Sequence, residues 1–294
     1  MKILICSDGM EPADTATHLG GLVAPALHAE VTLLGIAESD DQEKPLRDAV
    51  ELEADWLRAR GVSPEIVIRS GEPVHQIVDE TTKTTYDLVV IGARQTGSSG
   101  PYWRSGKTYE LIKTIEPPVL VAIGERARLK RILICTGGKE FIEQALQFTG
   151  TLAAPLGASV TLLHVMAEPP AIYADLVQME EDVNRLLESR SELGINLAEQ
   201  KKDLERLGVS VEVRVRHGIV LEQVFAEAGE GNYDLIVSGS SRARGMLRHY
   251  IMGDLTRSIL NHANCPVLVA RAGATSGPRG LLRVFHRWFA TKPQ

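Results

Sequence analysis

The sequence KILIC at residues 2–6 returns as RILIC at residues 131–135, an interval of 129 positions (131 minus 2). The sequence YDLVV at residues 86–90 likewise returns as YDLIV at residues 233–237. Each copy contains a continuous apolar run instead of an alternation of apolar and polar residues. Such runs are typical of parallel strands that are covered by helices on both faces. The chain therefore repeats one α/β unit, and two tandem doubly wound sheets are predicted.

Helix-periodic segments lie between the apolar runs. Leu46, Val50, Ala54 and Leu57, for example, fall on one stripe of a helix. Between the second and third strands the repeat interval grows from 129 to 147, a difference of 18 residues (147 minus 129). Eighteen residues make about five helical turns. We therefore expect a longer helix in the second half, within residues 172–207 and broken near Gly194.

The bulk composition restricts the class of protein. The chain has 294 residues, which suggests about two domains, and its net charge of −6 argues against a nucleic-acid partner. Its three cysteines form no CxxC pair, so we expect core thiols, not a disulfide framework. No pair of histidines has metal-ligand spacing, and no metal is predicted. The sequence shows no signal peptide and no spanning run, so a cytoplasmic protein is expected.

Four further features occur together. The first strand ends in an acidic residue and glycine at residues 6–9, and a glycine precedes the third helix of each half. The Tyr-Asp strand of each half ends in glycine, and the closing strand reads NCPVLVA at residues 264–270. In this combination the chain resembles the universal stress protein family over about residues 1–124 and 130–272.

The resemblance implies a fold and a role. It implies an adenine-nucleotide-alpha-hydrolase-like α/β fold with parallel five-stranded sheets in strand order 3-2-1-4-5. We expect two domains, residues 1–125 and 130–272, packed as a pseudo-dimer through their last strands. The family resemblance favours a stress-response regulatory protein that binds a small ligand, ATP or AMP, and acts through protein partners or as a homodimer. The alternative is a slow nucleotide hydrolase or transferase of the same fold.

Nucleotide-binding members of this family carry spaced glycines after strand 4, the last of them followed by Ser or Thr. Glycines allow the backbone to approach phosphates, and a helix N-terminus attracts anions. The first half departs from that pattern, with Gln95 at the second glycine position and a spacing from Gly92 to Gly106 that is one residue too long. The binding candidates of the first half are Asp8, Gly92, Arg94, Gly97, Ser98, Gly100, Gly106, Lys107 and Thr108.

The second half departs further from the glycine pattern of the nucleotide-binding members. Gly137 stands where the first half has Asp8, and Asp254 follows the last glycine of the loop. A carboxylate at that place repels a phosphate. The binding candidates of the second half are Gly239, Ser240, Ser241, Gly245 and Gly253. Three readings stay open: a site in the first half, a site in the second half, or two degenerate loops whose glycines only form turns.

Residues 273–294 extend beyond the repeat. On a helix their apolar and basic side chains would occupy opposite arcs, a pattern typical of helices that lie in a membrane interface. The alternative is that the apolar arc packs on this protein or on a second copy. The contact candidates of the tail are Arg279, Arg283, Phe285, Arg287, Trp288 and Phe289.

Overall fold

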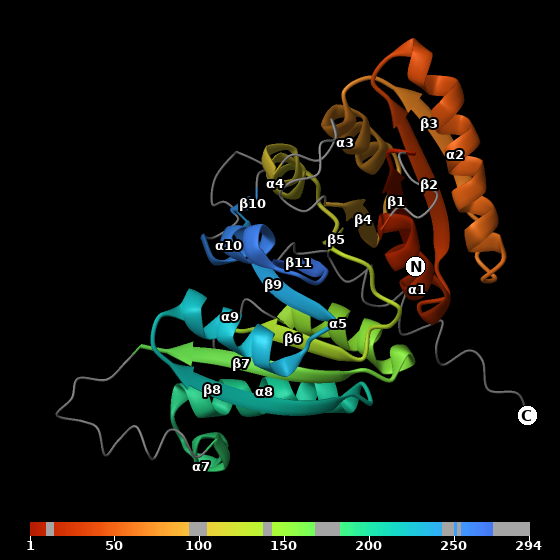
Figure 1. Cartoon of the computed structure of the whole chain (residues 1–294). Coiled ribbons are helices and arrows are strands. Elements are labelled where there is room, and N and C mark those ends of the chain that lie inside the picture. The colour runs from red at the N-terminus through yellow and green to blue at the C-terminus, as the bar shows by residue number, and fades with distance from the viewer. Residues whose placement is uncertain are drawn as a thin grey trace, which may run out of the picture.

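A computed structural model describes residues 1–9, 15–93, 105–137, 143–167, 183–242, 250–251 and 254–272 (Figure 1). The elements of the first half are β1 (Lys2–Ser7), α1 (Thr15–Ala26), β2 (Glu30–Ala37), α2 (Asp40–Arg58), β3 (Glu65–Ser70), α3 (Pro73–Lys83), β4 (Leu88–Gly92), α4 (Ser105–Thr114) and β5 (Val119–Ala122). Those of the second half are β6 (Arg131–Cys135), α5 (Glu143–Leu156), β7 (Ser159–Met166), α7 (Val183–Glu188), α8 (Glu192–Arg206), β8 (Ser210–His217), α9 (Val220–Gly231), β9 (Leu235–Arg242), β10 (Tyr250–Ile251), α10 (Asp254–His262) and β11 (Val267–Ala272).

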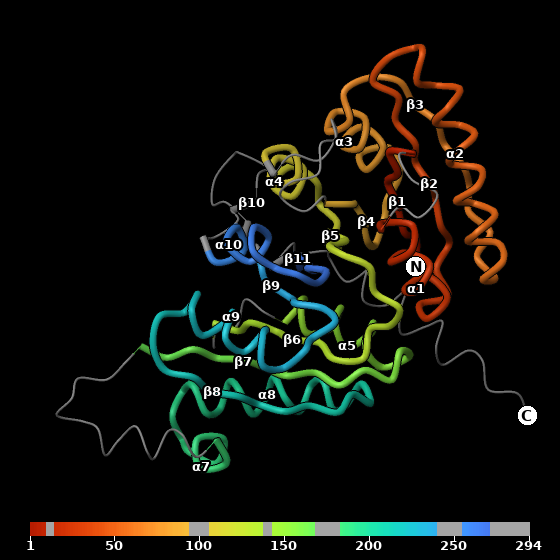
Figure 2. Tube along the Cα trace, in the orientation of Figure 1, coloured from red at the N-terminus to blue at the C-terminus, as the bar shows by residue number. Residues whose placement is uncertain are grey.

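The strands form one continuous sheet in the order β3-β2-β1-β4-β5-β11-β9-β6-β7-β8, with β10 paired to β9 at the side. Within each half the pairs of this path are parallel, and the order confirms the predicted 3-2-1-4-5 arrangement twice. The halves join through the antiparallel pair β5–β11, in which Leu120 lies opposite Leu268. Figure 2 shows these two strands meeting between the halves.

Helices cover both faces of the sheet. On β1, Ile3 and Ile5 belong to the core cluster that includes residues of α1, α2, α5 and α8, whereas Leu4 and Cys6 belong to the cluster on the other face, with residues of α3, α4, α9 and α10. This alternation follows from the period of two residues along a strand. Because both faces are covered, every residue from Ile3 to Cys6 is buried, as the continuous apolar run predicted.

The helical segment that we expected in the second half is broken near Gly194, as expected, and forms two helices, α7 and α8, of which neither is longer than α2. α8 has 15 residues and α2 has 19, so the additional residues lie before α8 and not within it. The chain turns between α7 and α8, where the Ser191 hydroxyl accepts from the Gly194 backbone N–H and caps α8. A Cβ on Gly194 would lie 2.1 Å from the Leu186 carbonyl oxygen, so only glycine allows this close approach.

All three cysteines are buried core residues, as predicted. Burial raises the pKa of the Cys135 thiol to about 12 and that of Cys265 to about 11, so neither is a reactive thiolate near neutral pH. Among the described residues, no helix is long and apolar enough to cross a membrane. The predicted domain limits, residues 1–125 and 130–272, stay predictions.

Candidate functional site

The candidate site of the first half lies at the carboxyl edge of its sheet. β1 is the central strand there, with β2 on one side and β4 on the other. The segments that follow these three strands therefore emerge side by side, together with the first turns of α3 and α4 (Figure 1). In open α/β sheets this is the edge at which ligands bind.

The turn after β1 carries Asp8 and is held by hydrogen bonds. The Ser7 hydroxyl donates to a carboxyl oxygen of Glu53 at 2.7 Å and accepts from the Gly9 backbone N–H at 3.0 Å. Gly9 has φ +65°, and a Cβ there would lie 2.8 Å from the Leu46 side chain. This turn favours glycine at position 9, and it places Asp8 at the carboxyl edge of the sheet.

Lys107 lies in the first turn of α4 and contacts two carboxylates. Its ammonium group is 3.1 Å from Glu38 and 3.3 Å from Glu72, which also caps α3 by accepting from the His75 N–H. Burial alone would lower the pKa of Lys107, but the hydrogen bonds with Glu38 and Glu72 raise that pKa above its usual value. Lys107 is thus fully charged. A phosphate that binds Lys107 would have to replace Glu38 and Glu72 as its partners.

Thr108 is the next residue, and its hydroxyl is buried without a hydrogen-bond partner among the described residues. An unsatisfied buried hydroxyl costs roughly 1–3 kcal/mol. At the interval of 148 residues that relates Pro118 to Pro266, the counterpart of Thr108 is Thr256 (256 minus 108). The Thr256 hydroxyl donates to the Gly239 carbonyl at 3.0 Å and contacts the Ser238 hydroxyl at 2.7 Å. Only the first half therefore leaves this hydroxyl available.

Two predicted glycines also lie at this edge. Gly92 ends β4 opposite Ala122 of β5. Gly106 precedes Lys107, and no described atom lies within 4 Å of the position that a Cβ would take there. Packing by the described residues thus does not require a glycine at position 106.

The second half arranges its edge differently. Gly239, Ser240 and Ser241 belong to β9, where they pair with Ala270, Arg271 and Ala272 of β11. Ser241 also lies opposite Ile251 of β10. The sequence pattern predicted a phosphate-binding loop at these residues, whereas the structure continues the strand through them. One edge of their backbone is therefore paired with β11, and Ser241 is paired on both sides.

The charges of the first site are missing in the second half. Where the first half has Glu38 and Glu72, the repeat intervals give Ala167 and Ile219, and the Ile219 side chain is 62% exposed. Gly137 replaces Asp8, as the sequence showed. The counterparts of the three acidic residues at the first edge are thus uncharged in the second half.

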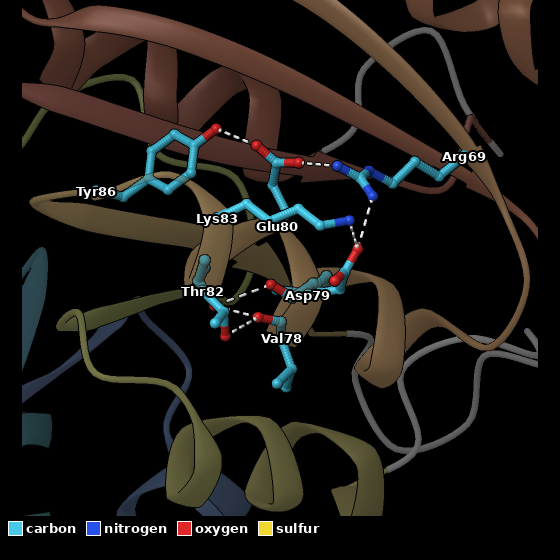
Figure 3. A network of polar contacts seen from close by, with 9 residues as sticks. Arg69, Val78, Asp79, Glu80, Thr82, Lys83 and Tyr86 are labelled. Carbon is cyan, nitrogen blue, oxygen red and sulfur yellow. Dashed lines mark hydrogen bonds and ion pairs between the residues drawn. The ribbon is translucent and has the colours of Figure 1, made fainter.

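Each half also has a buried polar network between its third helix and the sheet. In the first half Glu80 accepts from the Tyr86 hydroxyl at 2.7 Å and pairs with Arg69 (Figure 3). In the second half Glu227 accepts from the Tyr233 hydroxyl at 2.6 Å and pairs with Arg216 at 2.8 Å. Burial raises the pKa of Tyr233 to about 12. Because the network is the same in both halves, it is part of the fold and does not distinguish a site.

Sequence reasoning missed Glu38, Glu53 and Glu72. Glu53 could have been found, because it interrupts the buried stripe of α2 between Val50 and Ala54. A charged residue at a core-facing helical position needs an explanation. Glu38 and Glu72 had no such signal, because each is an ordinary polar residue in a loop.

Several predicted residues lie outside the described part of the chain. These are Arg94, Gly97, Ser98, Gly100, Gly245, Gly253 and the tail residues Arg279, Arg283, Phe285, Arg287, Trp288 and Phe289. Among the described residues, no group of three or more His, Cys, Asp or Glu side chains could hold a metal ion.

Comparisons with known proteins agree with the repeat. The model of the universal stress protein family matches residues 1–122 and again residues 128–271. Universal stress protein Slr1230 of Synechocystis sp. is 23% identical over 305 residues, covering 92% of this chain and 99% of the relative. Universal stress protein MJ0577 of Methanocaldococcus jannaschii is 29% identical over 154 residues, covering 48% of this chain and 94% of its own.

A solved structure has the same fold. The crystal structure of a universal stress protein from Archaeoglobus fulgidus superposes with a TM-score of 0.64 at 18% identity. The match covers 92% of this chain and 98% of that one, so the likeness in fold extends over both halves.

Proposed function

Because the chain belongs to the universal stress protein family through both of its halves, we propose that it is a regulatory protein that binds ATP or AMP in its first half. The observation that carries this proposal is the difference between Thr108 and Thr256. The buried hydroxyl of Thr108 has no partner among the described residues, whereas that of Thr256 is bonded to its own strand. A ligand oxygen at the start of α4 would accept a hydrogen bond from the Thr108 hydroxyl. The Thr256 hydroxyl already has its hydrogen bonds within the protein.

The groups at this edge suit the two ends of a nucleotide. The phosphates would lie at the N-terminus of α4, where free backbone N–H groups and Lys107 favour an anion. Asp8 would accept hydrogen bonds from ribose hydroxyls at the adenosine end. Lys107 would exchange Glu38 and Glu72 for phosphate oxygens, so binding should weaken at high ionic strength.

Calorimetric titration with ATP and with AMP tests the proposal. We expect about one nucleotide per chain, and Asp8→Ala or Thr108→Val should weaken binding by about fivefold or more, the worth of roughly one hydrogen bond. Thr256→Val is the matched control, because it removes the equivalent hydroxyl from the second half and should leave the affinity unchanged. Equal losses in the two threonine variants, or no heat with the wild-type protein, would reject a site in the first half.

The same samples address the alternative of a slow hydrolase or transferase. ADP released from ATP is measured over hours with the wild-type protein and with Asp8→Ala. Release that depends on Asp8 would favour the enzyme, and release equal to that without protein would favour the binding protein. Action through protein partners or as a homodimer belongs to the proposal, and light scattering of the purified chain measures the oligomeric state.

A further inference from the structure

Glu53 is a buried carboxyl group beside the candidate site. Its side chain has no exposed surface, and it lies between α2, β1 and α1. One carboxyl oxygen accepts from the Ser7 hydroxyl and the other from the Thr17 hydroxyl, each at 2.7 Å. Its hydrogen-bond partners among the described residues are thus hydroxyl groups, whereas the buried Glu80 and Glu227 each contact arginine.

The contact with Ser7 determines the shape of the Asp8 turn. Because the Ser7 hydroxyl hydrogen points to Glu53, the oxygen lone pairs of Ser7 are available to the Gly9 backbone N–H at 3.0 Å. Asp8 lies between these two residues in the chain. The position of Asp8 therefore depends on a chain of hydrogen bonds that begins at Glu53.

The second half keeps the geometry but not the charge. Gln200 stands at the place of Glu53 and accepts from the Thr136 hydroxyl at 3.0 Å. The counterpart of Thr17 is Leu146, which is buried and offers no second hydroxyl. An ionisable group therefore lies behind the first turn only, in the half that also has Asp8.

We propose that Glu53 is a positioning residue of the first half, which holds the Asp8 turn in its binding shape and takes up a proton when an anionic nucleotide binds. This inference rests on the proposed function. The charged group near Glu53 among the described residues is Asp8, while Ser7 and Thr17 are neutral. A bound nucleotide would bring further negative charge to the edge that carries Asp8 and would exclude water from the Asp8 turn, and both effects favour the protonated form of Glu53.

The direction of the pH dependence follows. Burial raises the pKa of Glu53 above its usual value, against the hydrogen bonds from Ser7 and Thr17, and the charge of Asp8 raises it further. If the bound nucleotide raises this pKa again, binding takes up protons and becomes tighter as the pH falls. Each unit of that additional rise corresponds to about a tenfold change in affinity across the titration.

The test compares Glu53→Gln, Glu53→Ala and wild type by ATP titration between about pH 5 and about pH 8. Glu53→Gln keeps an acceptor for Ser7 without the charge. We therefore expect the ratio of its affinity to that of wild type to increase as the pH rises across this range. Glu53→Ala removes the acceptor and should weaken binding by about five- to tenfold over the whole range. Comparison with Glu53→Gln separates the titration of Glu53 from that of the ATP phosphates.

Gln200→Ala is the control for a purely structural effect, because it removes the same support from the second half. It should leave the ATP affinity unchanged. Parallel pH profiles for wild type and Glu53→Gln would overturn the proposal, as would equal losses in Glu53→Ala and Gln200→Ala.

A second measurement separates this inference from the proposed function. The amide chemical shift of Gly9 is followed against pH by NMR, without nucleotide, in wild type and in Glu53→Gln. We expect one titration step that is present in wild type and missing in the variant. If ATP and AMP fail to bind, the proposed function fails, and identical Gly9 titrations in the two proteins would overturn the role of Glu53 independently.

Discussion

The carboxyl group of Glu53 should make the stability of the folded chain depend on pH. In the unfolded chain its pKa is about 4.3, and burial raises the pKa in the folded state. Between these two values the folded state binds more protons, so the free energy of unfolding falls as the pH rises through that range. The stabilisation that the raised pKa of Glu53 provides is fully present below the pKa of the unfolded chain. It is lost as the pH rises past the pKa of Glu53 in the folded protein.

Glu53→Gln removes this dependence at the same position. We therefore expect the stability of the variant relative to wild type to increase from about pH 4 to about pH 8, by about 1.4 kcal/mol for each unit of pKa shift. Urea unfolding at a series of pH values measures the difference. A difference that stays constant across the range would show that Glu53 has an ordinary pKa in the folded protein.

The hydroxyls of Thr108 and Thr256 should respond in opposite directions when they are removed. In protein free of nucleotide, Thr108→Val removes a buried donor without a described partner and should stabilise the fold by about 1 kcal/mol. Thr256→Val removes two hydrogen bonds and should destabilise the fold by about 1–2 kcal/mol. Thermal unfolding of the two variants measures both changes in stability. Two shifts of the unfolding temperature with the same sign would contradict the structural difference between the halves.

At the level of helices and strands, the sequence allowed most of the architecture to be predicted. Apolar runs such as residues 86–90 mark buried parallel strands, because few other elements need continuous apolar residues. The difference of 18 residues between the two repeat intervals indicated additional helix with a break near Gly194, but such a multiple of the helical repeat fits one long helix and two helices joined by a turn equally well. The Gly194 contact with Leu186 that decides between them is a tertiary contact, and periodicity does not report such contacts.

The site was predictable only in part for the same reason. Asp8, Gly106, Lys107 and Thr108 follow from their positions after strands or at the start of a helix. The partners that decide their chemistry come from elsewhere in the chain: Glu38 and Glu72 pair with Lys107 across long stretches of sequence. Nor could the sequence show that β9 continues through Ser240 and Ser241, because polar residues after a strand are as common in loops as in strand ends.

The β5–β11 pair should make the stability of each half depend on the other. Leu268 is fully buried and lies opposite Leu120 across the junction. Leu268→Ala should lower the free energy of unfolding by about 2–5 kcal/mol and should reduce amide hydrogen-exchange protection in β1 as well as in β6. Leu52→Ala is the matched control, because Leu52 is 61% exposed and the same truncation should change stability by about 0.5 kcal/mol or less. Loss of protection confined to the second half would show that the halves unfold independently.

At the scale of the whole molecule, the sheet is nearly symmetric and the two carboxyl edges are not. The first edge carries Asp8, Glu53 and Lys107, whereas the second carries Gly137 and Gln200 with a strand that extends through Ser241. The second half completes the sheet at the β5–β11 junction, and the residues that correspond to Asp8 and Glu53 are uncharged there. The proposed function therefore predicts one nucleotide per chain.

Residues 273–294 are the remaining segment to which the sequence assigns a role, and two roles stay open: packing on this protein or on a second copy, and contact with anionic membranes. They carry Arg279, Arg283, Arg287 and Lys292 without an acidic residue, beside Trp288 and Phe289. A basic amphipathic segment of this kind gains from apolar contact with the interface and from attraction to acidic lipids. Membrane contact predicts that the full chain sediments with vesicles that contain anionic lipid, and less at high salt.

A chain that ends at Gly273 should stay in the supernatant, and vesicles of neutral lipid should retain little of either protein. Trp288→Ala with Phe289→Ala tests the apolar contribution separately from the charge, since it leaves every arginine in place. Equal sedimentation of the full and shortened chains would reject membrane contact. The tail would then pack on this protein or on a second copy, and light scattering of the two chains distinguishes these, because only packing on a second copy makes the oligomeric state depend on the tail.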